Sequence, residues 1–111
     1  AGIQVDYSLG DIETLPKKES SLVLYRVLQE SLTNISRHAD ADQVEIEIQT
    51  DRNQIRLVIR DNGIGIPDKK LYSSTSYGII GMRERCTSAG GELHISGNKD
   101  WGTEVRAELP L

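Results

Sequence analysis

Residues 25–39 read YRVLQESLTNISRHA, and within them Glu30, Asn34 and His38 recur at every fourth position. An α-helix has about 3.6 residues per turn, so side chains spaced by four lie in a row along one flank. A carboxylate, an amide and an imidazole therefore share one edge of the predicted helix. Such an edge can hold a hydrated metal ion beside an activated nucleophile.

A glycine-punctuated turn, DNGIG, follows at residues 61–65. Glycine has no Cβ, so a planar or phosphorylated ligand can approach its backbone closely. Together with the polar edge of the helix, this turn indicates a nucleotide site.

The residues around the quoted stretch form helical and strand patterns. An apolar stripe with helical spacing begins after Pro16 and predicts a long helix from about residue 17. Residues 3–9 alternate between apolar and polar and predict a half-buried strand. The alternating runs 44–48 and 55–59, separated by a turn at 51–53, predict an antiparallel hairpin.

The C-terminal half adds a second helix and two further strands. Residues 68–76 have no periodicity and predict a mobile loop, after which a helix ends at Gly90-Gly91. Alternating residues at 93–95 and 105–109 predict strands. The order β-α-β-β-α-β-β predicts an α+β fold, a two-layer sandwich with helices on one face of a mostly antiparallel mixed sheet.

Composition limits the classes of protein to consider. With 111 residues the chain is one domain long, and its net charge of -4 with scattered basic residues argues against nucleic-acid binding. The single Cys86 excludes an internal disulfide, is expected in the core, and fits a reducing compartment. No apolar run approaches the roughly 20 residues of a membrane span, and the first residues do not resemble a signal peptide, so we expect a soluble domain.

Four stretches, in order, resemble the motifs of one family. Residues 29–39 (QESLTNISRHA) resemble the N box of histidine kinases, 61–66 (DNGIGI) the G1 box, 77–85 (YGIIGMRER) the G2 box and 102–105 (GTEV) the closing strand motif. One such match is weak, but four in order are specific. The chain therefore resembles the catalytic ATP-binding domain of sensor histidine kinases of the nitrate/nitrite-sensor type, in the superfamily of gyrase, Hsp90 and MutL.

The resemblance implies the Bergerat ATP-binding fold with a short lid, and ATP and Mg²⁺ as cofactors. It also implies that the chain is a fragment of a longer cytoplasmic or membrane-anchored parent that forms a homodimer. The γ-phosphate would pass to a histidine on a separate dimerisation and phosphoacceptor domain, with a response regulator downstream. We expect this domain itself to contact neither nucleic acid nor membrane, and not to phosphorylate itself when alone.

Two departures from the family pattern concern the phosphate end. The chain has Ser76-Tyr77-Gly78 where relatives commonly have Gly-His-Gly, a change expected to stiffen the lid. It has Arg37-His38 where they usually have Lys-His. Because an arginine fork can engage two phosphate oxygens, we expect phosphate binding by Arg37 to survive.

In the resembled family, the polar edge of the long helix carries the metal and the chemistry. Magnesium needs only one or two protein oxygens beside phosphate and water, so Asn34 is the predicted ligand and Glu30 the predicted base or water-orienting residue. Alternatively, Glu30 and Asn34 are only the solvated flank of an amphipathic helix, the commoner fate of such a pair. The other three boxes favour the functional interpretation.

Asp61 is the predicted adenine-recognition residue. An ionised carboxylate only accepts hydrogen bonds, so it suits the exocyclic amine of adenine and opposes the carbonyl of guanine. ATP should therefore bind better than GTP. Thr103 is expected to assist, directly or through water. The alternatives are that Asp-Asn-Gly is only a turn and Thr103 only a β-branched strand residue.

The glycine-rich boxes are expected to touch the nucleotide. Gly63 and Gly65 would lie near the base and ribose, and Gly78 and Gly81 near the phosphates, because a helix N-terminus attracts anions. Turn geometry alone is the alternative for each pair. The predicted contacts of the two boxes are Gly63, Gly65, Ile66, Gly78, Gly81 and Met82.

Neither histidine resembles the residue that receives phosphate in this family. His38 is expected to line the phosphate end of the pocket or to cap the helix, and His94 to be structural. We expect no chemical role for Trp101. Two other functions remain open: a serine kinase of the anti-sigma-factor type, and a non-catalytic interaction module switched by ATP.

Overall fold

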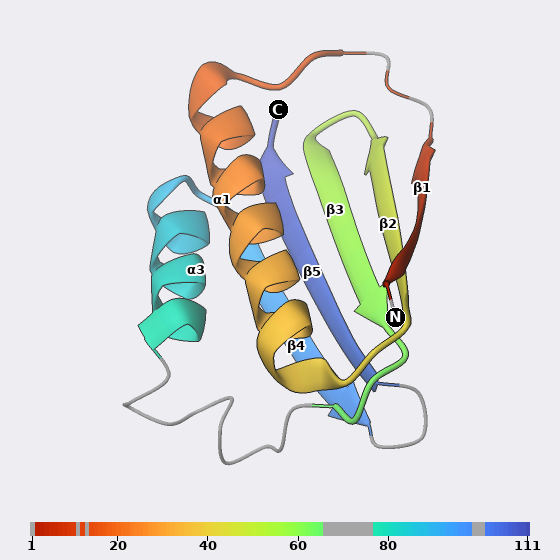
Figure 1. Ribbon diagram of the computed structural model, residues 1–111. Coiled ribbons are helices and arrows are strands. Elements are labelled where there is room, and N and C mark those ends of the chain that lie inside the picture. Colours follow the sequence, from red (N-terminus) through yellow and green to blue (C-terminus); the bar gives the residue numbers. More distant parts are fainter. Residues whose placement is uncertain (1, 11, 13, 66–76, 99–101) are drawn as a thin grey trace.

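The computed structural model describes residues 2–10, 12, 14–65, 77–98 and 102–111, which form a sheet with helices on one face (Figure 1). The helices and strands follow the predicted order. In chain order they are β1 (Gln4–Leu9), α1 (Lys18–Asn34), the π-helical turn η1 (Ile35–Ala39), β2 (Gln43–Thr50), β3 (Gln54–Asp61), α3 (Tyr77–Ser88), β4 (Glu92–Asn98) and β5 (Gly102–Pro110).

The sheet has the strand order β1-β2-β3-β5-β4, with β1 parallel to β2 and every other pair antiparallel. The predicted hairpin is therefore confirmed. In its turn, Asp51 Oδ1 accepts the N–H groups of Asn53 (2.9 Å) and Gln54 (3.0 Å). These bonds hold the pKa of Asp51 below its usual value. The predicted α+β two-layer fold is also confirmed.

The core lies where α1 and α3 pack on β3, β5 and β4. It contains Val27 from α1, Leu57 from β3 and Ala107 from β5, all essentially inaccessible to solvent. Cys86 of α3 is also fully buried, as predicted, and burial raises the pKa of its thiol. In the described ranges no helix is both long and apolar enough to cross a membrane.

The prediction that residues 3–9 form a half-buried strand is wrong in one respect, because all six residues of β1 are exposed. Val5, Tyr7 and Leu9 share the helix-bearing face and are 45%, 78% and 68% exposed. The cause is visible in Figure 1: α1 and α3 cover β3, β5 and β4, whereas β1 lies at the uncovered edge. Alternation identifies side chains that share a face, but it does not reveal whether a helix covers that face.

The other face of the sheet carries charged residues. Arg60 lies 2.7 Å from Glu104 on β5, and its guanidinium also approaches Glu45 and Glu47 on β2. Val58, between these strands, is buried although neither α1 nor α3 covers this face. Long paired side chains thus shield the open side of the sheet.

The sequence predicts that the long helix continues regularly to Ala39. In the structure it instead changes to a π-helical turn after Asn34. Asp40 then ends it in a left-handed conformation, with φ 51° and ψ 42°. Glu30 and Asn34 therefore share one flank of α1, whereas position 38 falls in the π-helical turn.

The C-terminus of α3 agrees with the prediction. Gly90 has φ +84°, and the N–H of Gly91 donates to the carbonyl of Cys86 at 2.8 Å. This is the geometry of a helix closed by glycine.

Candidate functional site

The four motif segments meet at one end of the molecule, where α1 and β3 end and β5 and α3 begin (Figure 1). The antiparallel pairing of β3 with β5 accounts for part of this, since Arg60 pairs with Glu104 and the end of β3 therefore adjoins the start of β5. Asp61 thus lies beside Gly102 and Thr103, although they are far apart in sequence.

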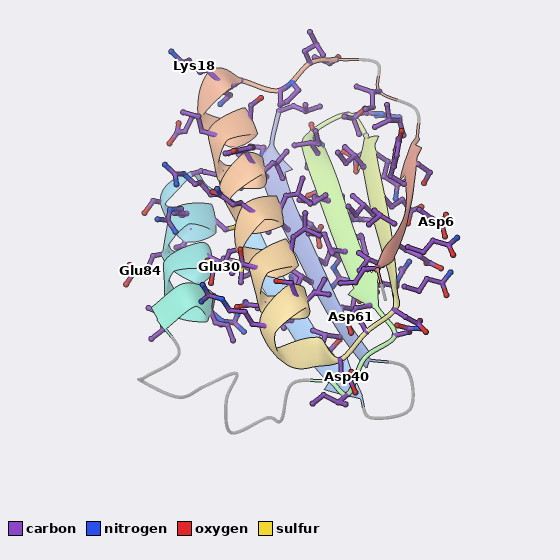
Figure 2. All side chains as sticks on the ribbon, in the orientation of Figure 1. Asp6, Lys18, Glu30, Asp40, Asp61 and Glu84 are labelled. Carbon is purple, nitrogen blue, oxygen red and sulfur yellow. The ribbon has the colours of Figure 1, made fainter. Side chains whose placement is uncertain are left out.

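Asp61 is the last residue of β3 and is only 5% exposed (Figure 2). Its Oδ1 accepts two backbone N–H groups, from Gly63 at 2.8 Å and from Thr103 at 3.3 Å. Among the described residues, none donates a hydrogen bond to Oδ2. The carboxylate is therefore oriented through one oxygen and offers the other.

The ionisation of Asp61 reflects two opposing effects. Burial raises the pKa of this carboxyl, and the hydrogen bonds from Gly63 and Thr103 act in the opposite direction. The effect of burial is the larger. An ionised Asp61 is thus a partly desolvated acceptor, the kind of group that discriminates between ligands able and unable to donate a hydrogen bond.

Gly102 supports Asp61 in a way that the sequence analysis missed. It has φ +104°, and a Cβ at this position would overlap the Asp61 carbonyl oxygen and lie 2.7 Å from Oδ1. A side chain here would displace the carboxylate or the strand. The only sequence signal was the glycine immediately before Thr103, which the sequence analysis includes only as part of the closing strand motif.

Asn62 is a second residue that the sequence analysis missed. Its Oδ1 accepts the N–H groups of Asp42 and Gln43, each at 3.0 Å, and its Nδ2 donates to Asp42 Oδ1 at 2.6 Å. These bonds join the start of β2 to the end of β3. They fix the direction in which the chain leaves Asp61 toward Gly63 and Gly65.

The glycines of this turn have different local roles. Gly63 is buried and its N–H donates to Asp61. Gly65 has φ +79°, which is a backbone reason for glycine whether or not a ligand is bound.

Glu30, Asn34 and Arg37 are less tightly held. Glu30 and Asn34 are partly exposed and Arg37 is exposed, and no described residue forms a hydrogen bond or ion pair with any of their side chains. Glu30 lies on the side of α1 that faces α3 (Figure 2). Amide and carboxylate oxygens without partners have the chemistry that Mg²⁺ prefers.

The two glycines of α3 are not equivalent. Gly78 is the second residue of the helix, so its N–H lies in the first turn, which has no intrahelical acceptors. Gly81 is the fifth residue, and in a regular helix its N–H bonds the carbonyl of Tyr77. The argument that free N–H groups bind phosphate therefore applies to Gly78 and fails for Gly81.

Met82 lies in the core. It is 1% exposed, and Ser31 of α1 donates to its sulfur at 3.9 Å. This position favours a packing role between α1 and α3 over a nucleotide contact.

Some predicted positions lie outside the described residues: Ile66, the loop 68–76, Trp101 and the side chain of His38. His94 is described and lies on the open face, with Nε2 3.1 Å from Glu92 and 3.9 Å from Glu108. In the described part of the chain, no three His, Cys, Asp or Glu side chains are arranged to hold a metal ion.

A surface hollow of about 340 Å³ also touches Asp61, but it opens on the charged face of the sheet. It is lined by Gln43, Glu45, Arg60, Asp61, Asn62 and Glu104. Glu45 and Glu104 already pair there with Arg60. The Asp61 side chain belongs to the opposite face, since its cross-strand partner is the core residue Val44. We therefore place the candidate site on the helix side.

Comparison with known proteins identifies a family. Residues 19–111 match the family described as histidine kinase-, DNA gyrase B-, and HSP90-like ATPase. Among curated relatives, the histidine-protein kinase/phosphatase DegS of Brevibacillus brevis is 33% identical over 99% of this chain and 28% of its own length. The nitrate/nitrite sensor NarX of Escherichia coli K12 is 31% identical over 93% of this chain and 17% of its own length. The chain thus spans less than a third of these two relatives.

Solved structures agree in fold. The histidine kinase domain of the blue-light activated kinase of Erythrobacter litoralis EL346 has a TM-score of 0.74 and 24% identity, covering 99% of this chain and 52% of its own. Histidine kinase AdeS of Acinetobacter baumannii has a TM-score of 0.79 and 17% identity, covering 99% of this chain and 55% of its own.

Proposed function

The chain belongs to the histidine kinase-, DNA gyrase B- and HSP90-like ATPase family, and from this premise we propose that it is the ATP-binding catalytic domain of a sensor histidine kinase. The relatives named above support this choice within the family. The observation that carries it is Asp61, a buried carboxylate oriented by two backbone N–H groups and offering one oxygen.

In this proposal Asp61 recognises the base. Oδ2 accepts a hydrogen bond from the 6-amino group of adenine, while Gly63 and Thr103 hold Oδ1 in place. Guanine presents a carbonyl oxygen at the corresponding position, and two acceptors facing each other in a desolvated site repel. The site therefore selects ATP over GTP.

The polar flank of α1 serves the phosphates. The Asn34 side chain offers an amide oxygen to Mg²⁺, and Glu30 acts as base or orients the attacking group. Arg37 follows in the η1 turn and provides positive charge for the phosphates. His38, in the same turn, lines the phosphate end of the pocket. Bound magnesium would neutralise charge on the phosphate oxygens. An ion that takes most of its ligands from phosphate and water does not need a cluster of protein carboxylates.

The proposed phosphoryl transfer follows from these residue roles. Phosphoryl transfer needs positioning and charge neutralisation more than covalent chemistry from the protein. We propose that the γ-phosphate passes to a histidine on a dimerisation and phosphoacceptor domain of a longer, dimeric parent, and from there to a response regulator.

A transfer experiment tests this function. The chain, mixed with Mg-ATP and a histidine-bearing helical hairpin from a similar sensor kinase, should produce phosphate on the hairpin that is lost in acid. It should not phosphorylate itself. Acid-stable phosphate on a serine substrate would instead identify a serine kinase of the anti-sigma-factor type. Tight Mg-ATP binding without transfer to either acceptor would identify an ATP-switched interaction module.

A further inference from the structure

Gly78 and Glu30 fit together across the two helices. If Gly78 carried a Cβ, the three nearest atoms would all belong to the Glu30 side chain. The Cβ would overlap Oε1 and lie 2.9 Å from Cδ and 3.5 Å from Cγ. The Glu30 carboxylate therefore occupies the space that a side chain at position 78 would fill.

We propose that Gly78 is a positioning residue for Glu30: by lacking a side chain, it leaves the space against the start of α3 in which the Glu30 carboxylate lies. This inference rests on the proposed function, in which Glu30 acts on the attacking group. In this role Gly78 does not serve close approach to a phosphate. It determines where the carboxylate of Glu30, from α1, can lie.

The electrostatics of α3 support this arrangement. The first turn of a helix carries partial positive charge from its unpaired N–H groups, and acidic side chains are favourable there. The first turn of α3 has no acidic residue of its own. Glu30 brings a negative charge to this helix start from α1, so any anion that approaches α3 meets Glu30 there.

Gly81 provides the contrast. A Cβ at Gly81 would have one near neighbour, Arg85 Nη1 at 3.1 Å, which is the end of a flexible side chain on α3 itself. No atom of α1 lies within 4 Å of that position. Substitutions at the two glycines should therefore differ in their dependence on Glu30.

A melting experiment tests the fit in the chain as it stands. Gly78→Ala would meet only flexible side-chain atoms, so it should displace the carboxylate and leave the helices in place. Alanine in a helix also raises stability over glycine. We expect Gly78→Ala to raise the melting temperature by about 2–5 °C in a Glu30→Ala background. With Glu30, or with the isosteric Glu30→Gln, the rise should be smaller or reversed. Equal shifts in all three backgrounds would overturn the proposal.

A kinetic experiment tests the positioning role. With the added phosphoacceptor hairpin, Gly78→Ala should lower kcat at least about tenfold and leave the KM for Mg-ATP unchanged. A displaced base loses part of the roughly 10²–10⁴-fold that general acid–base catalysis contributes. In the Glu30→Ala background Gly78→Ala should cause no further loss, whereas any effect of Gly81→Ala should be the same with Glu30 and with Ala at position 30. A raised KM with unchanged kcat would instead assign Gly78 to the phosphates.

The two experiments separate this inference from the proposed function. If the unsubstituted chain transfers no phosphate, the proposed function fails, while the melting temperatures still decide whether Gly78 accommodates Glu30. If transfer occurs but the three melting shifts are equal, the function stands and the positioning role is wrong.

Discussion

Asp61 and Glu30 are both carboxylates of the proposed site, but the fold holds them differently. Asp61 is 5% exposed, accepts two backbone N–H groups and packs against a glycine at position 102. Glu30 is partly exposed, has no hydrogen bond to a described residue and lies against Gly78. The proposed base end is thus built from backbone groups, whereas the proposed phosphate end consists of side chains that have no partner among the described residues.

This difference has thermodynamic consequences. Backbone donors that the fold already orients lose little freedom when a ligand binds, so they favour selectivity. Side chains that must be ordered by the ligand cost about 0.5–1.5 kcal/mol each, and a divalent ion can offset that cost. We therefore expect base selectivity to depend on the Asp61 region, and magnesium dependence to depend on the α1 flank.

We expect the largest loss of stability from a substitution that disturbs the surroundings of Asp61. Gly102→Ala would place a methyl group in overlap with Asp61 at a φ of +104°. We expect a loss of about 2–4 kcal/mol in the free energy of unfolding, measured by denaturant titration, together with weaker Mg-ATP binding.

Gly90→Ala is the matched control. Gly90 also has positive φ, +84°, but a Cβ there would make only an ordinary contact, 3.5 Å from Pro110 Cγ. It should cost about 1 kcal/mol from backbone strain and leave nucleotide affinity unchanged. If the two variants were equally stable, the overlap with Asp61 would not matter.

At the proposed phosphate end, we expect a smaller loss of nucleotide affinity, and only when magnesium is present. Asn34→Ala removes the proposed magnesium ligand and no hydrogen bond within the described chain. Calorimetry should show about a tenfold weaker affinity for Mg-ATP, unchanged affinity for ATP without magnesium, and stability within about 0.5 kcal/mol of the original. Gln29→Ala, on the exposed side of α1, is the control. Equal losses with and without magnesium would exclude a metal role for Asn34.

The contrast between the two ends also explains what the sequence could predict. Alternating residues predicted β3, and continuing that alternation places Asp61 on the inner face. Helical periodicity predicted the row of Glu30 and Asn34 on α1. These signals are local, because strand and helix periods fix which side chains share a face.

What the sequence could not predict depends on contacts between distant segments. Gly102 meets Asp61, and Gly78 meets Glu30, only after the strands and helices have packed. The exposure of β1 depends on how far the helix layer extends over the sheet. The π-helical turn after Asn34 likewise left no periodic signal in the sequence.

The smallest predicted effect is on the pH dependence of stability. Because the pKa of Asp61 is raised in the folded state, the folded protein retains this proton to higher pH than the unfolded chain. Stability should be greatest below the pKa of the unfolded chain, fall as pH rises through the interval up to the folded pKa, and stay lower at neutral pH. Asp61→Asn should remove this fall and be more stable than the original chain at pH 7. A variant less stable than the original at pH 7 would contradict this.

The most direct test of the account is calorimetric titration of the original chain and Asp61→Asn with Mg-ATP and Mg-GTP at neutral pH. The original chain should bind ATP about 5- to 150-fold more tightly than GTP, the range for one unsatisfied buried acceptor, and the variant should lose this preference. Equal affinity of the original chain for both nucleotides, or a preference for ATP that remains in Asp61→Asn, would contradict the central claim that Asp61 recognises the adenine base.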